Sequence, residues 1–164
     1  MSGEALVATE QASVLIAEDD RFDQLILKRA FKAARLGVAV QFVEQGEELL
    51  SRLRRSEEAA GQANVTLPAI IFLDLNMPVL DGWEALRLVR EEPRWASILI
   101  VVMSTLAREA DIARLYASGA NAYLPKPSSF EGMVSAIRSC AAPWLTSPEA
   151  HDEGQLHPQH GAAP

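Results

Sequence analysis

The chain has 164 residues and a formal net charge of −7, with 49% hydrophobic and 23% charged residues. This composition is typical of one soluble globular domain, and the negative charge argues against nucleic-acid binding, which needs a basic face. No apolar run approaches the roughly 20 residues that span a bilayer, and the N-terminus lacks the basic and apolar regions of an export signal. We therefore expect a cytoplasmic protein that does not contact a membrane.

Short apolar runs and amphipathic stretches alternate along the chain from residue 13 onward. The apolar runs have the length and composition of buried strands and lie at 13–17, 38–44, 69–73, 97–103 and 121–125. Apolar residues recur at helical spacing in the other segments, which lie at 20–37, 46–58, 82–92, 107–119 and 129–145. Because nearly continuous apolar strands alternate with helices, we expect a parallel sheet that helices cover on both faces.

The predicted fold is a flavodoxin-like (βα)₅ doubly wound sheet with the strand order 2-1-3-4-5. Residues 13–145 are predicted to form this domain, with a flexible N-terminus at 1–12 and a disordered tail at 146–164. All three histidines lie in that tail, and Cys140 is the only cysteine. We therefore expect no catalytic triad, intrachain disulfide or histidine-ligated zinc in the folded domain.

Local signals predict where the helices begin and which side of each one packs on the sheet. Asp20 is the expected N-cap of the first helix, and Gly37 is expected just past its end. The apolar residues at helical spacing in this segment are Phe22, Leu25, Ile26, Ala30 and Ala33. The residues expected to face inward in the last helix are Phe130, Met133, Val134 and Ile137.

Polar side chains follow the predicted strands at the edge where a doubly wound sheet has its functional crevice. Glu18 and Asp19 follow the first strand, and Asp74 follows the third. Ser104 follows the fourth strand, and Lys126 follows the fifth, between two prolines that fix its backbone. Three clustered carboxylates repel one another, and one hard cation such as Mg²⁺ together with the lysine would balance their charge. The sequence therefore predicts an oxygen-ligated Mg²⁺ site at this edge.

Simpler interpretations of the same residues remain open at this point. Asp20 is expected only to cap its helix. Asp74 could start the turn in "NMPVLDG", a role that also suits Asp81 and Gly82, and Lys126 could be a solvated loop residue. Turn formation does not account for acids at two adjacent strand ends with a lysine nearby.

Four motifs, "LIAEDD", "IIFLDLNMPVLDGWE", "VVMSTLA" and "AYLPKP", resemble those of the receiver domain of two-component response regulators, over 13–145. The resemblance implies that Asp74 accepts a phosphoryl group from a phosphohistidine on a sensor histidine kinase. It also implies that Glu18, Asp19 and Asp74 hold Mg²⁺ together with the main-chain carbonyl of Asn76. Such a protein is a phospho-acceptor that assists its own phosphorylation and dephosphorylation, not an enzyme acting on other substrates.

The resemblance also implies a switch around the phosphorylation site. Ser104 would swing to hydrogen-bond the phosphoryl group, and the rotamer of Tyr123 would follow it. Lys126 would pair first with Asp74 and then with the phosphoryl group, and its peptide bond to Pro127 is expected to be cis. The result would be a change in the surface that the protein presents to its partners.

Two further stretches, "LRRSEEAAGQANVTLPAIIFLDLNMP" and "APWLTSPEA", resemble those of phytochrome-associated regulators. We therefore expect a single-domain regulator whose kinase is a bacteriophytochrome and whose output is a protein contact or onward phosphotransfer. This subgroup also implies a homodimer formed through the C-terminal region. Trp144 and Leu145 are candidate interface residues, with packing back on their own chain as the alternative.

Two other functions compete with phospho-acceptance. An aspartyl-nucleophile phosphatase of the haloacid-dehalogenase type has an acid two residues beyond its nucleophile, whereas this chain has Asn76 there. A receiver-like scaffold that is never phosphorylated would have lost an acid or the lysine, and this chain keeps Asp74 and Lys126. Both alternatives are weaker than a phosphorylated receiver.

Overall fold

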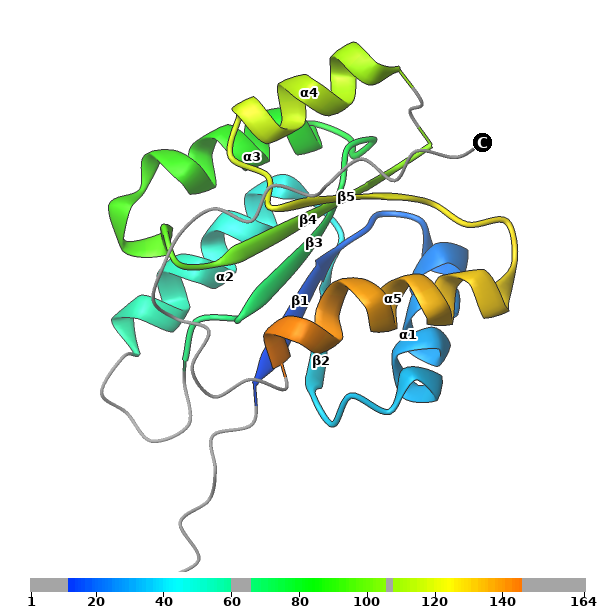
Figure 1. Cartoon of the computed structure of the whole chain (residues 1–164). Helices are drawn as coiled ribbons and strands as arrows, with labels where there is room; N and C mark the ends of the chain where they lie inside the picture. The colour runs from blue at the N-terminus through cyan, green and yellow to red at the C-terminus, as the bar shows by residue number, and fades with distance from the viewer. Residues whose placement is uncertain (1–11, 60–65, 106–107, 146–164) are drawn as a thin grey trace, which may run out of the picture.

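A computed structural model of the chain describes residues 12–59, 66–105 and 108–145. The described strands form one parallel sheet in the order β2-β1-β3-β4-β5, which confirms the predicted topology (Figure 1). Their bounds are β1 Ser13–Ala17, β2 Ala39–Val43, β3 Ile70–Asp74, β4 Leu99–Ser104 and β5 Ala122–Pro125. The predicted flexible N-terminus and the predicted disordered tail lie outside the described residues, apart from residue 12.

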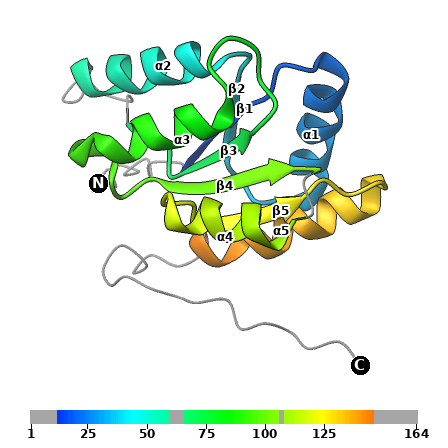
Figure 2. The same cartoon turned by 90° about the horizontal axis from the view of Figure 1, so that it is seen from above.

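Helices cover both faces of the sheet, as the apolar strands predicted. Their bounds are α1 Arg21–Ala34, α2 Gly46–Glu58, α3 Gly82–Glu91, α4 Glu109–Ala117 and α5 Phe130–Leu145, with a short 3₁₀ helix η1 at Pro93–Trp95. Helices α1 and α5 pack side by side on one face, and α2 and α3 lie on the other (Figure 2). No helix in the described ranges is long and apolar enough to cross a bilayer.

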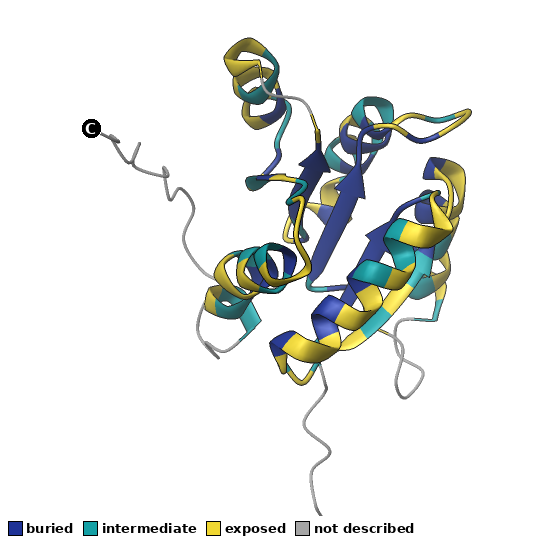
Figure 3. Ribbon diagram, turned by 90° about the vertical axis from the view of Figure 1, so that its right-hand side faces the viewer, coloured by how far each residue is buried: buried dark blue, intermediate teal, exposed yellow. Residues whose placement is uncertain are grey.

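Alternate residues of the central strands supply two separate hydrophobic layers. In β1, Leu15 and Ala17 belong to the layer under α2 and α3, while Val14 and Ile16 belong to the layer under α1 and α5. The middle strands are buried, and exposed residues lie on the outer sides of the helices and in the connecting loops (Figure 3). A strand buried on both faces holds the residue at its carboxyl end in a fixed position.

The first helix begins as predicted but ends earlier and packs a different side. Asp20 accepts a hydrogen bond from the main-chain N–H of Asp23 at 2.9 Å, so it is the N-cap. The helix ends at Ala34, so the residue just past its end is Arg35, in the left-handed region, and not the predicted Gly37. Of the predicted stripe only Ile26 and Ala30 turn inward, and the buried residues are Leu27, Ala30, Phe31 and Ala34.

The last helix also differs from prediction at its first residue. Phe130 is the first residue of α5 and leaves 42% of its surface exposed, so its predicted inward orientation is wrong. Met133 and Ile137, one and two turns later, are buried over the sheet as expected. Trp144 and Leu145 lie in the last turn of α5 and pack against the layer under α1 and α5. These two residues therefore contact their own chain, and the predicted homodimer stays a prediction.

Candidate functional site

Three carboxylates meet where β1 and β3 end. Ala17 and Leu73 are neighbours in the parallel pairing of these strands, so Glu18 and Asp74, one residue further on, emerge side by side. One carboxylate oxygen from each of Glu18, Asp19 and Asp74 lies within 4.8 Å of the others. Glu18 and Asp74 are buried, and Asp19 is the most exposed of the three. The predicted convergence of acids at this edge is therefore confirmed.

The turn after β3 folds closely under Asp74. The Asp74 carboxylate accepts a hydrogen bond from the main-chain N–H of Asn76 at 3.2 Å. Asp81 caps α3 by accepting from the N–H of Glu84 at 2.9 Å, which is the local role expected for it. A Cβ atom on Gly82 would lie 2.3 Å from the main-chain oxygen of Asp74, so only glycine fits at this close approach.

Lys126 lies at the centre of the acid cluster. Its main-chain N–H donates to the carbonyl of Ser104 at 3.0 Å, which ties the segment after β5 to the end of β4. The Lys126 ammonium lies 2.9 Å from Glu18, 3.2 Å from Asp23 and 3.3 Å from Asp74. The predicted partner Asp74 is therefore joined by Glu18, which is nearer, and by Asp23.

Two features of this arrangement were not predicted correctly. Sequence reasoning missed Asp23, because a first-turn aspartate is usual in any helix and the lysine that it meets lies 103 residues away. The peptide bond between Lys126 and Pro127 is not cis, since every described peptide bond is trans. The trans form is favoured for X–Pro bonds, and Lys126 reaches all three acids with it.

Burial and charge set the ionisation of the cluster. The pKa of Glu18 is raised from 4.5 to about 7, mainly by burial and also by the negative charge of Asp74, while hydrogen bonds from Lys126 and from the N–H of Asp20 act in the opposite direction. Burial alone would lower the pKa of Lys126, but the hydrogen bond and charge of Glu18 and the charge of Asp74 raise it above its usual value. Lys126 therefore stays charged while Glu18 holds its proton more tightly than an exposed glutamate.

The acid cluster has the chemistry of a site for a hard divalent cation. Its donors are carboxylate oxygens, and no nitrogen or sulfur ligand belongs to the cluster among the described residues. The raised pKa of Glu18 also reflects this excess of buried negative charge, because the single positive charge of Lys126 does not offset the burial of the carboxylates. Glu18, Asp19 and Asp74 therefore fit a metal such as Mg²⁺, and the carbonyl of Asn76 stays a predicted ligand.

Ser104 and Tyr123 connect the cluster to the last strand and to α4. Ser104 ends β4 and is buried. Its carbonyl accepts a hydrogen bond from the Tyr123 hydroxyl at 3.4 Å, and burial raises the pKa of that hydroxyl. The main-chain N–H of Tyr123 in turn donates to the hydroxyl of Tyr116 in α4 at 3.2 Å. The structure thus places Glu18, Asp19, Asp74 and Lys126 together and joins Ser104 to Lys126 and Tyr123 through its carbonyl, while the metal-ligating role of Asn76 stays a prediction.

Residues 14–138 match the family model of the response regulator receiver domain. The chain belongs to the response regulator receiver family. The probable methanogenesis regulatory protein FilR2 of Methanothrix harundinacea (strain 6Ac) is 31% identical over 144 residues, which cover 88% of this chain and 90% of FilR2. Receiver domains interact with histidine kinases, so the family also gives the class of partner.

Solved structures of other response regulators resemble this receiver over most of its length. RPA3017, a response regulator in red light signaling of R. palustris, is 34% identical with a TM-score of 0.73, and the match covers 88% of this chain and 99% of RPA3017. The phosphorylated cyanobacterial phytochrome response regulator RcpA is 28% identical with a TM-score of 0.71, covering 83% of this chain and 95% of RcpA. Phytochrome response regulators are thus structural neighbours of this chain.

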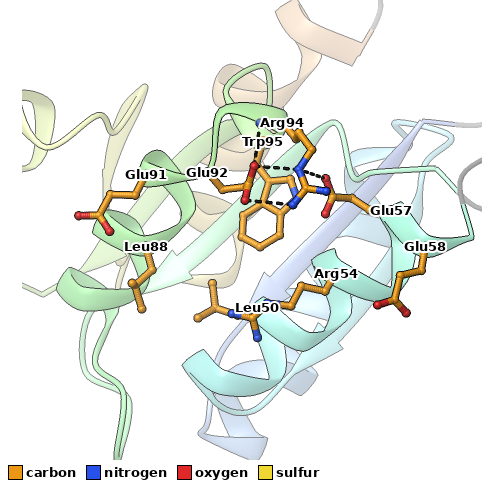
Figure 4. Close-up of a pocket in the computed structure, with 9 residues that line it drawn as sticks. All are labelled: Leu50, Arg54, Glu57, Glu58, Leu88, Glu91, Glu92, Arg94 and Trp95. Atoms are coloured by element: carbon orange, nitrogen blue, oxygen red, sulfur yellow. Dashed lines mark hydrogen bonds and ion pairs between the residues drawn. The ribbon is translucent and has the colours of Figure 1, made fainter.

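An open cavity of the receiver is separate from the acid cluster. It has a volume of about 460 Å³, is open, and lies between α2, α3 and η1 (Figure 4). Its lining includes Arg94, which forms ion pairs with Glu57 at 3.1 Å and with Glu92 at 2.8 Å. A smaller cavity of about 130 Å³ borders the acid cluster and is lined by Glu18 and Lys126. The ionisable groups at the strand ends, not the larger cavity, therefore form the candidate functional site.

Proposed function

We propose that this chain is a single-domain response regulator that accepts a phosphoryl group on Asp74 from a sensor histidine kinase, in a Mg²⁺-dependent reaction. One observation carries the proposal: Asp74 lies at the end of a fixed strand, 3.3 Å from the Lys126 ammonium and within 4.8 Å of Glu18 and Asp19. This is a carboxylate held between a cation and a set of metal-binding oxygens. The same arrangement gives a carboxylate nucleophile its charge compensation.

The chemistry of the transfer needs little more than positioning and charge. An oxygen of Asp74 forms a bond to phosphorus while the bond between phosphorus and the imidazole nitrogen of the donor breaks, and that nitrogen keeps the electron pair. Lys126 balances the charge that develops on the transferred group. A bound Mg²⁺, held by Glu18, Asp19 and Asp74, would supply further charge neutralisation on the phosphoryl oxygens.

Ser104 and Tyr123 are the residues proposed to change conformation when Asp74 gains a phosphoryl group. The Ser104 hydroxyl would turn toward the phosphoryl group on Asp74, and the Ser104 carbonyl already holds the Tyr123 hydroxyl at 3.4 Å. Because Tyr123 is also joined to α4 through Tyr116, a change at Ser104 would be passed to α4 and β5. The outer surface of these elements is the proposed output surface.

Intact mass after incubation with Mg²⁺ and acetyl phosphate tests the proposed function. We expect one labile phosphoryl adduct on the wild-type protein and none on Asp74→Asn. Asp81→Asn is the matched control, because it makes the same substitution at a helix cap where asparagine is equally suitable. Turnover of acetyl phosphate without an adduct would favour a phosphatase, and no reaction would favour a non-phosphorylated scaffold.

The exposed apolar side of α1 supports a protein as the phosphodonor. Phe22 and Leu25 are exposed by 70% and 45%, although both are large and apolar, and both lie in the first turns of α1 beside Asp23. We propose that the kinase contacts these residues when it presents its phosphohistidine to Asp74. The similarity to RcpA, a cyanobacterial phytochrome response regulator, and to RPA3017, a regulator in red light signaling, supports a phytochrome, such as a bacteriophytochrome, as this kinase. A cytoplasmic location stays a prediction from composition.

Phe22→Ala is expected to slow phosphotransfer from a phosphorylated bacteriophytochrome kinase by about tenfold, the effect of losing one aromatic anchor from an interface. Phosphorylation by acetyl phosphate is expected to stay at the wild-type rate, because the Phe22 side chain is exposed and apolar and supplies no charge to the acid cluster. Both rates can be measured by following the adduct with time. Lys32→Ala, a substitution at an exposed position in the last turn of α1, is the control. Equal slowing of both reactions would argue for a damaged fold instead of a lost contact.

A further inference from the structure

We infer that Asp23 is a positioning residue that holds the Lys126 ammonium in the unphosphorylated site and gives it up when a phosphoryl group arrives. The inference rests on the proposed function, since it concerns the proposed acceptor Asp74. It starts from an aspartate that the sequence did not single out and that lies 3.2 Å from the Lys126 ammonium. The contact joins the first turn of α1 to the segment after β5.

The Lys126 ammonium is engaged with three carboxylates in this structure, through hydrogen bonds to Glu18 and Asp23 and an ion pair with Asp74. An ammonium group has three N–H donors, and Lys126 contacts three carboxylates, those of Glu18, Asp23 and Asp74. A phosphoryl group on Asp74 would bring new oxygens that also require this cation. Lys126 can turn further N–H donors to these oxygens only if Glu18 or Asp23, its present hydrogen-bond partners, is released.

Asp23 is the partner whose release costs least. The Glu18 side chain is 1% exposed and the Asp74 side chain 4%, so neither could be hydrated if it lost the lysine. The Asp23 side chain is 39% exposed, and water can replace the ammonium as its partner. The main-chain N–H of Asp23 is bound to Asp20, so the turn stays in place while only the carboxylate moves.

The charge of Asp23 also opposes the arriving group. With Asp23 included, four carboxylates surround Lys126 and the proposed metal site. Their negative charges outnumber the positive charges of one lysine and one divalent cation. The unphosphorylated site thus has a surplus negative charge next to the position of an anionic donor. Asp23 therefore slows phosphorylation and favours the unmodified state, both because it adds negative charge and because it holds Lys126.

Adduct formation with acetyl phosphate and Mg²⁺ in the full chain tests the inference. Asp23→Asn keeps the size of the side chain and removes its charge, and we expect it to form the adduct about threefold faster, the size of effect typical of a half-exposed charge pair. Asp20→Asn is the matched control, because it removes the same charge one turn away, keeps the helix cap and touches no part of Lys126. Asp23→Glu, which restores the charge, is expected to return the rate toward that of the wild type.

The Lys126 ammonium itself gives a second readout that a purely structural role would not move. Its ¹⁵N resonance is expected to shift in Asp23→Asn and to stay unchanged in Asp20→Asn. An Asp23→Asn rate equal to or below that of Asp20→Asn, or an unmoved resonance, would overturn the role of Asp23 alone, provided that the wild type forms the adduct. A wild type that forms no adduct would overturn both this role and the proposed function.

Discussion

Replacing Lys126 with methionine is expected to slow the phosphorylation of Asp74 by about a hundredfold or more, the usual loss when one charge-stabilising group is removed from an active site. Methionine keeps most of the length of lysine but carries no charge. The developing negative charge on the phosphoryl group would then be balanced only by the metal. The rate of adduct formation with acetyl phosphate, measured by intact mass in saturating Mg²⁺, gives this effect directly.

Two further variants define the origin of the Lys126 effect. Lys126→Arg keeps the charge but not the compact ammonium that meets Glu18, Asp23 and Asp74, so partial activity is expected. Lys28→Met, at an exposed position of α1, is the matched control and is expected to react at the wild-type rate. A Lys126→Met protein that is folded by circular dichroism and reacts like the wild type would contradict the proposed role of this lysine.

In the absence of divalent cations, the free energy of unfolding is expected to fall by up to about 3 kcal/mol as the pH rises from about 4.5 to 7. The cause is Glu18, whose pKa is 4.5 when unfolded and is raised to about 7 in the folded protein. Between these values the folded state binds the Glu18 proton and the unfolded state does not, so stability decreases as the pH rises. The raised pKa of Lys126 has the same sign of linkage, because here too the folded state binds the proton more tightly, but it acts only above about pH 10.

Urea unfolding in EDTA at several pH values measures this dependence. Glu18→Gln has no proton to lose at this position and is expected to show a flatter profile, whereas Glu109→Gln, exposed in α4, is expected to keep the wild-type slope. Saturating Mg²⁺ is expected to stabilise the wild type more at pH 8 than at pH 6, because the metal competes with the Glu18 proton. Equal slopes in the wild type and in Glu18→Gln would contradict this assignment.

The architecture and most of the site could be predicted from local sequence patterns. The five-residue core of β3, Ile70–Asp74, is apolar until its last residue, which predicted both a strand buried on two faces and a carboxylate at its end. The order of strands in a doubly wound sheet then placed Glu18, Asp74 and Ser104 at one edge. These predictions succeeded because strand periodicity is local and because parallel strands bring their carboxyl ends to the same side.

Local sequence patterns therefore specify the sheet, its strand order and the residues at its carboxyl edge. Only the tertiary structure decided that Leu27 and Phe31, not Phe22 and Leu25, face the core, because more than one stripe of α1 fits a helical period and packing selects between them. The same is true of the contact between Asp23 and Lys126 and of the proton affinity of Glu18. These properties depend on distances and burial between segments far apart in the chain, which no local pattern contains.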